Sequence, residues 1–400
     1  MAAAEIDGFV APGFEGVRDA FAANFESHGE VGASFCLYHR GEPVVDLWGG
    51  VADPATGRPY ERDTCQLVFS TTKGVVAICA NRLMDEGRLD PDAPVAEYWP
   101  EFAQAGKQDL PVRWLLSHQA GLPVLDVTLT LDETLRWDPV VEALAAQAPI
   151  WEPGTKHGYH ATTFGWLVGE VIRRVTGQSV GEYVAEHLAG PLGLDLWIGV
   201  PEERLGQVAP LVPIDLPDNE NVRMVIDQLL GPDSLTGRAL RTPCPDLFGG
   251  TEGTVDLSMF GDPRVLGAEI PAANGVTNAR ALARLYSACI DEVDGIRLLS
   301  DAQVARAIEP QVTGPDAIMF FPTVLGMGFF LSSGFSNYGG PRGFGHTGTG
   351  GSMGFADPDA HIGYGYVMNQ LLPNMIGDAR TVALTEACYE AVGGVPPAIV

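Results

Sequence analysis

Ser70 and Lys73 have the residue types and the spacing for nucleophilic catalysis. They lie three residues apart, so a helix places both side chains on one face. Most of the 24 basic residues are arginine, yet a lysine precedes the apolar run 75–80. A buried lysine can release its proton and act as a base, whereas an arginine cannot. Ser70 is therefore a candidate nucleophile with Lys73 as its base, near a helix N-terminus that favours developing negative charge. Alternatively, Ser70 is only the N-cap of that helix.

A second serine, Ser352, lies in a segment (350–354) that matches the G-x-S-x-G pattern of a nucleophile elbow. That pattern requires a strand before the serine, a helix after it, and a later aspartate and histidine. Residues 363–368 have the pattern of a strand instead, and His361 is the only later histidine. We therefore predict that Ser352 is not the nucleophile. A dinucleotide-type glycine pattern at 343–348 lacks a βαβ context, and we predict no cofactor.

Tyr159 and the glycine-rich segment 345–351 carry the remaining candidate groups. Tyr159 lies just before a predicted helix over 163–175, where its hydroxyl could relay the Ser70 proton; alternatively, it is a core aromatic. Glycines on a strand let a substrate approach closely. A backbone N–H of this segment and that of Ser70 could hold an oxyanion, while His346 and Thr347 could donate to the substrate or leaving group. Alternatively, the segment is a glycine-rich sheet edge.

Hydrophobic periodicity indicates which elements position these groups. Helices are predicted over residues 14–25, 70–86, 163–175, 277–290 and 376–392, with a capping box at Ser179 and Glu182. A hairpin is predicted from strands at 33–38 and 44–48, and further strands at 327–332, 343–347, 352–356 and 363–368. The stretch 201–271 shows little periodicity and is rich in proline and glycine.

This order of elements predicts an α+β fold, in which the early and late strands join one sheet. We expect a discontinuous α/β domain formed by residues 1–88 and 290–400, and a helical domain formed by residues 89–289. The predicted site lies where the two regions meet.

Composition limits the classes of partner. The 400 residues are 46% hydrophobic and 19% charged, as in folded globular proteins, and the formal net charge of −27 argues against a nucleic-acid partner. No apolar run approaches the ~20 residues of a membrane span. Residues 1–7 have no secretory-signal pattern, which predicts a cytoplasmic protein.

The cysteines and histidines predict neither a disulfide framework nor a metal centre. The six cysteines are scattered singly, which indicates reduced, buried side chains. His157 and His160 form the one close histidine pair, and no carboxylate or thiol stands at a matching spacing.

Three motifs in order resemble the serine β-lactamase and penicillin-binding protein superfamily, and family VIII carboxylesterases most of all. These motifs are Ser70-Thr71-Thr72-Lys73, Pro153-Gly154 ahead of Tyr159, and His346-Thr347-Gly348. The segments 115–123 and 191–194 extend the resemblance, which covers about residues 30 to 390.

The resemblance implies a role for each of these residues. Ser70 would be the nucleophile, Lys73 its base and Tyr159 the partner in proton transfer, with backbone N–H groups of Ser70 and Thr349 as the oxyanion hole. His346, Thr347 and Gly348 would bind the substrate. The implied fold is an antiparallel sheet flanked by helices, beside an all-helical lobe.

Two departures from the β-lactamase pattern favour an ester substrate. Ala161 stands two residues after the tyrosine, where asparagine is usual, and His346 stands where lysine is usual. Alanine cannot hydrogen-bond a substrate amide, and histidine is a weaker anchor for a carboxylate at neutral pH. We therefore predict a serine hydrolase that cleaves small carboxylic esters with short acyl chains.

Other functions remain possible on the sequence alone. A D-amino-acid peptidase, a penicillin-binding or β-lactamase-like amide hydrolase, and an acyltransferase share this chemistry. A catalytically inactive homologue that binds a ligand belongs to a different class. The sequence gives no oligomeric state.

Overall fold

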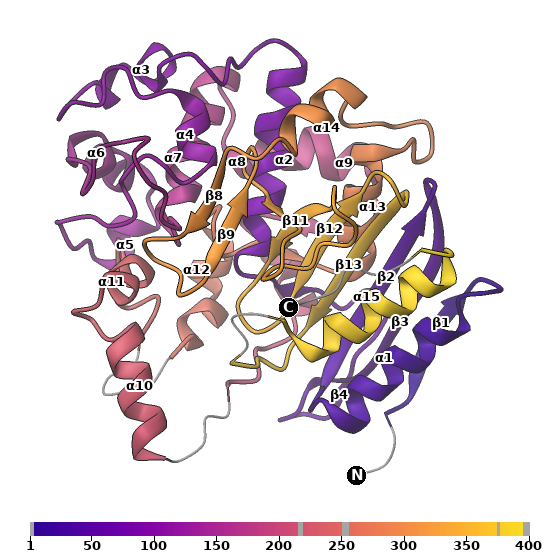
Figure 1. Cartoon of the computed structure of the whole chain (residues 1–400). Coiled ribbons are helices and arrows are strands. Elements are labelled where there is room, and N and C mark those ends of the chain that lie inside the picture. Colours follow the sequence, from indigo (N-terminus) through magenta and orange to yellow (C-terminus); the bar gives the residue numbers. More distant parts are fainter. Residues whose placement is uncertain (1–3, 215–218, 250–255, 374–376, 395–400) are drawn as a thin grey trace.

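A large antiparallel sheet is assembled from both ends of the chain (Figure 1). The computed structural model describes residues 4–214, 219–249, 256–373 and 377–394. The main sheet has the order β1-β3-β2-β13-β12-β11-β10-β9-β8, with β4 paired to β3. A small second sheet has the order β5-β7-β6. The strands are β1 (Ile6–Val10), β2 (Gly32–His39), β3 (Glu42–Asp53), β4 (Arg58–Pro59), β5 (Gln66–Leu67), β6 (Leu196–Trp197), β7 (Val276–Thr277), β8 (Val312–Pro315), β9 (Pro322–Leu325), β10 (Phe330–Leu331), β11 (Phe344–Thr347), β12 (Met353–Asp357) and β13 (Ile362–Met368).

The predicted union of early and late strands is confirmed at the pairing of β2 with β13. Phe35 pairs with Tyr366, and Cys36 pairs with Gly365. Gly365 also faces α13 (Ala279–Ile290): a Cβ there would lie 2.2 Å from the carbonyl oxygen of Ala279. The glycine therefore lets a helix pack closely on the centre of the sheet.

Helices cover both faces of this sheet, as the predicted α+β fold requires. In Figure 1, α1 (Glu15–Ser27) and α15 (Ala379–Ala391) lie side by side over one face, while α13 packs on the other. Four helical predictions, over 14–25, 70–86, 163–175 and 277–290, correspond to α1, α2, α7 and α13. The prediction over 376–392 corresponds to α15, although Ile376 lies outside the described residues.

The remaining helices lie mostly between the two halves of the sheet in sequence. They are α2 (Thr71–Asp85), α3 (Val95–Tyr98), α4 (Val112–Leu116), α5 (Leu131–Thr134), α6 (Asp138–Ala146), α7 (Thr163–Thr176), α8 (Val180–Val184), α9 (Gly190–Leu192), α10 (Glu220–Leu230), α11 (Leu235–Arg241), α12 (Pro263–Gly267) and α14 (Asp301–Ala307), with further helical turns η1 (Pro100–Phe102), η2 (Ala185–Ala189), η3 (Glu202–Gln207) and η4 (Ser258–Gly261). The capping box of Ser179 and Glu182 is present at α8.

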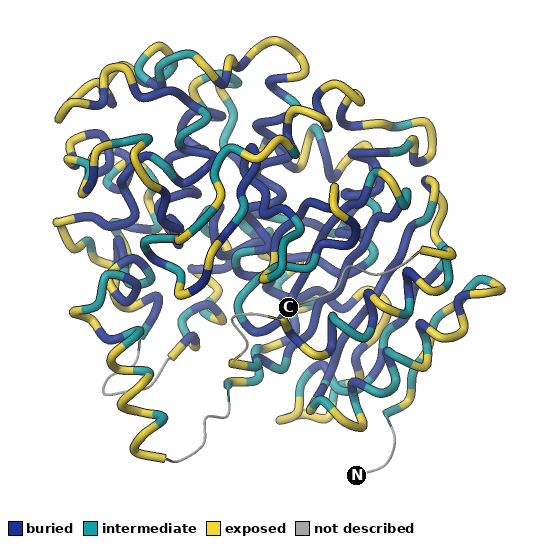
Figure 2. The backbone as a smooth tube through the Cα atoms, in the orientation of Figure 1, coloured by how far each residue is buried: buried dark blue, intermediate teal, exposed yellow. Residues whose placement is uncertain are grey.

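Helix α2 is the buried element that joins the helical region to the sheet. Its residues are buried on every side from Thr71 to Asn81, and it contacts α7, α8, β11 and α14. A helix that is enclosed all round belongs to the core, and Figure 2 shows the dark blue of buried residues through this region. Among the residues that the structure describes, no helix is both long and apolar enough to cross a membrane.

Candidate active site

Ser70 lies at the N-terminal end of α2 and follows a residue with unusual backbone geometry. Phe69 has φ 44°, in the left-handed region that non-glycine residues seldom occupy. Its conformation is held because its carbonyl oxygen accepts hydrogen bonds from the backbone N–H and the hydroxyl of Thr72. The Ser70 side chain makes no capping hydrogen bond to α2, so its hydroxyl is not used as an N-cap.

Lys73 is a fully buried amine without a carboxylate partner among the residues that the structure describes. Its Nζ lies 3.0 Å from Ser70 Oγ and donates to the carbonyl oxygen of Ala272 at 2.9 Å. Burial lowers the pKa of Lys73 well below its ordinary value of 10.5. In its neutral form, which burial favours, this amine has a lone pair that can accept the proton of Ser70.

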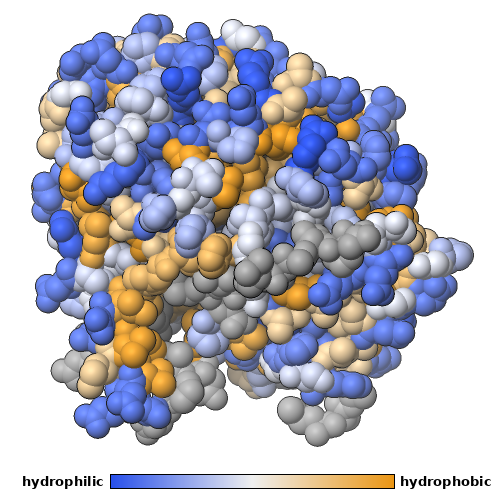
Figure 3. All heavy atoms as spheres, in the orientation of Figure 1, coloured by the Kyte–Doolittle hydropathy of each residue, from blue (hydrophilic) through white to orange (hydrophobic). Residues whose placement is uncertain are grey.

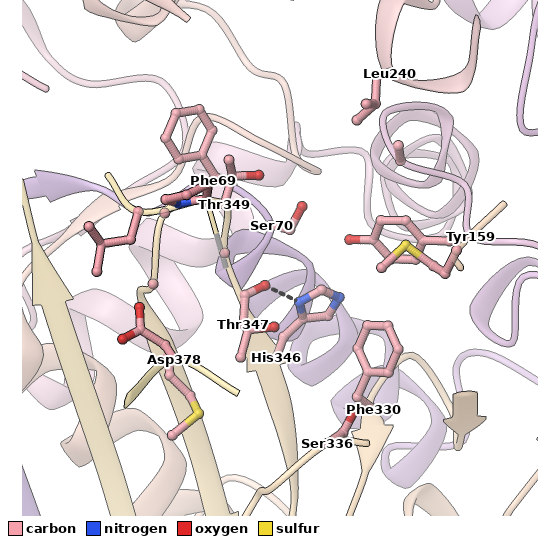
Figure 4. Close-up of a pocket in the computed structure, with 18 of the residues that line it drawn as sticks. Phe69, Ser70, Tyr159, Leu240, Phe330, Ser336, His346, Thr347, Thr349 and Asp378 are labelled. Carbon is pink, nitrogen blue, oxygen red and sulfur yellow. Dashed lines mark hydrogen bonds between the residues drawn. The ribbon is translucent and has the colours of Figure 1, made fainter. Parts of the chain in front are cut away.

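Tyr159 presents its hydroxyl to Ser70 from the other side of the site (Figure 4). Its backbone N–H donates to Asp316 Oδ1 at 3.0 Å, and Lys73 Nζ lies 4.8 Å from the centre of its ring. The residue is 7% exposed, and burial raises the pKa of its hydroxyl, an effect that a hydrogen bond with Ser70 opposes. Tyr159 therefore remains protonated at neutral pH unless a base acts on it.

The glycine-rich segment after β11 brings a second backbone donor next to Ser70. In Figure 4, Thr349 lies beside Phe69 and Ser70. Within the described residues, neither the Ser70 N–H nor the Thr349 N–H donates to another protein group. Gly348 permits this approach, because a Cβ there would lie 2.1 Å from the carbonyl oxygen of Val68. Two free N–H groups at this place suit an oxyanion.

Ser352 connects the glycine-rich segment after β11 to the start of α2 through hydrogen bonds. The side chain is fully buried, and its Oγ donates to the carbonyl oxygen of Val68 at 2.9 Å and lies 3.0 Å from Thr71 Oγ1. Its own carbonyl oxygen accepts from the N–H of Gly348 at 2.8 Å and from the Thr71 hydroxyl at 3.2 Å. The strand β12, not a helix, follows, and burial keeps Ser352 away from any substrate.

A buried ionic network contacts the glycine-rich segment after β11. This network was not predicted from the sequence. The fully buried Arg380 pairs with Asp378 at 2.7 Å and with Glu30 at 3.2 Å, and donates to the carbonyl oxygen of Gly350 at 2.5 Å. Burial raises the pKa of Glu30 to about 7, against the attraction of Arg380. These residues are distant in sequence, so no local pattern could show the network.

His346 and Thr347 contribute different groups to the site. His346 Nδ1 lies 2.6 Å from the carbonyl oxygen of Thr347, which can only accept, so Nδ1 carries the proton and Nε2 has the lone pair. Burial, together with nearby Lys73, lowers the pKa of His346 to about 3, which keeps the ring neutral. A neutral ring in this tautomer accepts at Nε2. The side chain of Thr347 is exposed in the cavity and has a hydroxyl that can donate.

The histidine pair of the sequence has structural partners. His160 Nδ1 lies 2.7 Å from the carbonyl oxygen of Gly158, and its Nε2 accepts from the N–H of Leu122 at 2.9 Å. His157 Nε2 lies 2.9 Å from Thr323 Oγ1. No group of three or more metal-ligating side chains occurs within the described ranges.

His118 is a site neighbour that the sequence analysis did not single out. Its ring packs on Tyr159 with centroids 5.0 Å apart, and its Nδ1 accepts from the N–H of His160 at 3.0 Å. Burial lowers its pKa well below the ordinary value. It lies in the segment 115–123, where the resemblance was the only available signal.

A cavity of about 360 Å³ opens in front of Ser70. Its wall is mostly apolar, and Ala161 forms part of it beside Tyr159. The arrangement as a whole offers a hydroxyl, a phenol and two free backbone donors around one cavity, with the buried amine of Lys73 3.0 Å from the hydroxyl.

The β-lactamase family model matches residues 17–388, almost the whole chain. The chain belongs to the β-lactamase family. A curated relative, esterase/β-lactamase LipL of Mycobacterium tuberculosis, is 37% identical over 380 residues, which cover 91% of this chain and 83% of LipL.

Solved structures of the same family are similar over nearly the full length. The crystal structure of a family VIII carboxylesterase has a TM-score of 0.85 and 40% identity, and the match covers 97% of this chain and all (100%) of that one. A penicillin-binding protein homologue from Caulobacter crescentus has a TM-score of 0.81 and 37% identity, with the same coverage of 97% and 100%. These relatives support a hydrolase of the serine β-lactamase and penicillin-binding protein superfamily.

Proposed function

We propose that this protein of the β-lactamase family is a carboxylesterase that cleaves small neutral esters with short acyl groups through an acyl-enzyme. Ser70 is the proposed nucleophile, Lys73 its base and Tyr159 the partner in proton transfer. One observation carries the proposal: the buried amine of Lys73 lies 3.0 Å from Ser70 Oγ and its pKa is lowered by burial. An uncharged amine at hydrogen-bond distance is what deprotonation of a serine requires.

The proposed reaction has two halves. Lys73, together with Tyr159, removes the Ser70 proton while Oγ forms a bond to the ester carbonyl carbon. The carbonyl oxygen becomes an oxyanion between the N–H groups of Ser70 and Thr349. The bond to the alcohol oxygen then breaks, and the alcohol leaves with the proton returned through Tyr159. Water attacks the acyl-enzyme in the same manner and releases the acid and free Ser70.

The polar groups of the cavity favour a neutral ester over an anionic β-lactam or peptide. His346 is neutral because of its lowered pKa of about 3, and Ala161 offers no side-chain amide. Arg241 is the one cation among the described cavity-lining residues, and its Nη1 donates to the carbonyl oxygens of Leu230 and Gly237 at 2.6 and 3.3 Å. Neither His346 nor Ala161 therefore offers a substrate carboxylate or amide the partner that lysine and asparagine would provide, and desolvation of a carboxylate would oppose binding.

Residual hydrolysis of β-lactams is a second candidate activity. The relative LipL is named an esterase/β-lactamase, and a neighbouring structure is a penicillin-binding protein homologue. The groups proposed to act on an ester carbonyl would also act on a strained amide. A slow acyl transfer to added alcohols would use the same acyl-enzyme.

Labelling of Ser70 by an organophosphonate tests the proposal. We expect one adduct by intact-protein mass in the wild type and in a control, Ser27→Ala, at an exposed position in α1. Ser70→Ala should give no adduct and lose turnover of p-nitrophenyl acetate and butyrate by roughly 10⁴-fold or more. Full turnover by Ser70→Ala, or an adduct on another residue, would overturn the assignment.

A further inference from the structure

Helix α10 is an amphipathic helix that forms part of the cavity wall without belonging to the core. None of its residues is buried, and Figure 2 shows much of it in yellow. Ile226, Leu229 and Leu230 line the cavity that contains Ser70. Met224 and Val225 are 61% and 52% exposed, and Figure 3 shows orange, hydrophobic surface over α10. Ile226, Leu229 and Leu230 therefore face whatever enters the cavity, whereas Met224 and Val225 are exposed residues of the same helix that do not line it.

This wall is connected to the Tyr159 side of the site. The hydroxyl of Thr236, in α11, donates to the carbonyl oxygen of Ile318 at 2.5 Å. Asp316 Oδ1 accepts from the backbone N–H groups of both Ile318 and Tyr159, at 2.8 and 3.0 Å. Helix α10 contacts α11, and Figure 4 shows Leu240 of α11 above Tyr159, on the same side of Ser70. The apolar wall of α10, α11 and residues 316–321 is thus on the side of the site that Tyr159 occupies.

The position of Tyr159 determines which half of a bound ester, the acyl group or the alcohol, contacts the α10–α11 wall. Tyr159 returns a proton to the departing alcohol oxygen, so that oxygen must lie within hydrogen-bond reach of the phenol. The group attached to it then extends past Tyr159 toward Ile318, Leu240 and α10. A cavity of about 360 Å³ is within the range of drug-sized ligand sites, and so exceeds the needs of a small alcohol.

We infer that the preferred substrates are esters of bulky, uncharged, apolar alcohols, and that the α10–α11 wall is the alcohol site. The inference rests on the proposed esterase function and adds the substrate class. The short acyl group occupies the region next to Thr349, and the large group of the ester lies on the alcohol side.

Two isomeric esters test the direction of binding. In 3-cyclohexylpropyl acetate the bulky group is in the alcohol, and in ethyl 3-cyclohexylpropanoate it is in the acyl half. Both have the same atoms and similar hydrophobicity, and both release a primary alcohol, so leaving-group chemistry is matched. We expect kcat/KM, measured by pH-stat titration, to be about tenfold or more higher for the acetate.

Variants of α10 test the wall itself. Leu229→Ala and Ile226→Ala remove apolar surface from the cavity, whereas Val225→Ala changes an exposed side chain on the same helix. The two cavity variants should lower the ratio of kcat/KM for 3-cyclohexylpropyl acetate to that for ethyl acetate by about threefold to tenfold. Val225→Ala should leave this ratio unchanged.

The outcomes separate this inference from the proposed function. If ethyl acetate is hydrolysed but the two isomers react equally, or the propanoate reacts faster, the alcohol site is wrong and the esterase function stands. An equal loss of activity toward all esters in the cavity variants would also overturn the alcohol site. If no ester is hydrolysed and Ser70 forms no phosphonate adduct, the proposed function fails and this inference fails with it.

Discussion

At the scale of single residues, the ionisation of Lys73 controls the proposed chemistry, and it predicts a pH dependence. The protonated amine cannot accept the Ser70 proton. We therefore expect kcat/KM to be constant above the lowered pKa of Lys73 and to fall as the pH decreases through it. His346 and His160, with pKa values lowered to about 3 and 4, remain neutral across this range and add no limb near neutral pH.

Replacement by arginine distinguishes a base from a structural cation. Lys73→Arg keeps a positive charge that does not dissociate in proteins. We expect kcat/KM for p-nitrophenyl acetate to fall by roughly 10²–10⁴-fold. The rate of Ser70 phosphonylation should fall in parallel, and the acid limb should disappear from what activity remains. A wild-type profile that stays flat to acid pH, or an active Lys73→Arg variant, would contradict the role of Lys73 as a base.

At the scale of elements, the hydroxyls of Thr71 and Ser352 set the distance between the start of α2 and the segment after β11. Each hydroxyl has one proton to donate. Because Ser352 Oγ donates to the carbonyl oxygen of Val68, Thr71 Oγ1 is the donor in its contact with Ser352, and the two hydroxyls form one chain of hydrogen bonds. The two proposed oxyanion donors, at Ser70 and Thr349, are carried by the two elements that this chain joins. Thr71 and Ser352 are thus positioning residues.

Thr71→Val and Thr71→Ser form a matched pair that tests this positioning. Valine removes the hydroxyl with almost no change in volume, whereas serine keeps it. We expect Thr71→Val to lower kcat for p-nitrophenyl acetate by roughly 10–100-fold with KM nearly unchanged, because misplaced donors weaken transition-state binding. Thr71→Ser should retain most of kcat. If both variants lose kcat equally, or if Thr71→Val changes only the melting temperature, the hydroxyl does not position the donors.

The elements also show how far the sequence could predict the structure. Helices α2, α7 and α13 were predictable, because each has a long apolar face or apolar run that tertiary packing satisfies. Strand β1 was missed because it is a short edge strand that alternates between partly buried and exposed residues and contains Gly8. Strands β8 and β9 were missed because each contains a proline at one end.

Two further differences have local causes. The predicted strand 327–332 is reduced to β10 (Phe330–Leu331), since a turn with Gly328 at φ +89° precedes it. The stretch 201–271 gave no pattern, yet it includes α10, whose apolar face lines a cavity and not a packed core. Of the candidate site, Ser70 and Lys73 were singled out by spacing and residue type, and the role expected for Tyr159 came from the family resemblance. The Arg380 network was not predicted, because it joins residues that only the fold brings together.

At the scale of the whole molecule, the site lies where the sheet and the helical region meet on the buried helix α2. The proposed division into residues 1–88 with 290–400 and residues 89–289 remains our proposal; α13, within the second range, packs on the sheet. Lys73 belongs to α2 and is buried without a counter-ion among the described residues. Folding must therefore either remove the proton of its ammonium group or bury the charge, and both lower the free energy of unfolding. Catalysis and stability therefore oppose each other at this residue.

Lys73→Met should make this opposition measurable in the free energy of unfolding. Methionine fills a similar volume and loses only the hydrogen bonds of the amine, worth about 1 kcal/mol each. The wild-type chain must release a proton from Lys73 on folding, because its pKa is lowered from 10.5 in the folded state. In the pH range between the lowered pKa and 10.5 the unfolded chain holds the extra proton, so wild-type stability rises with pH.

We expect denaturant titrations to show Lys73→Met inactive but more stable at pH 7, with the difference shrinking toward pH 10. A difference that is constant over this range would mean that Lys73 keeps its proton in the folded protein, and the base in the proposed reaction would have to be another group.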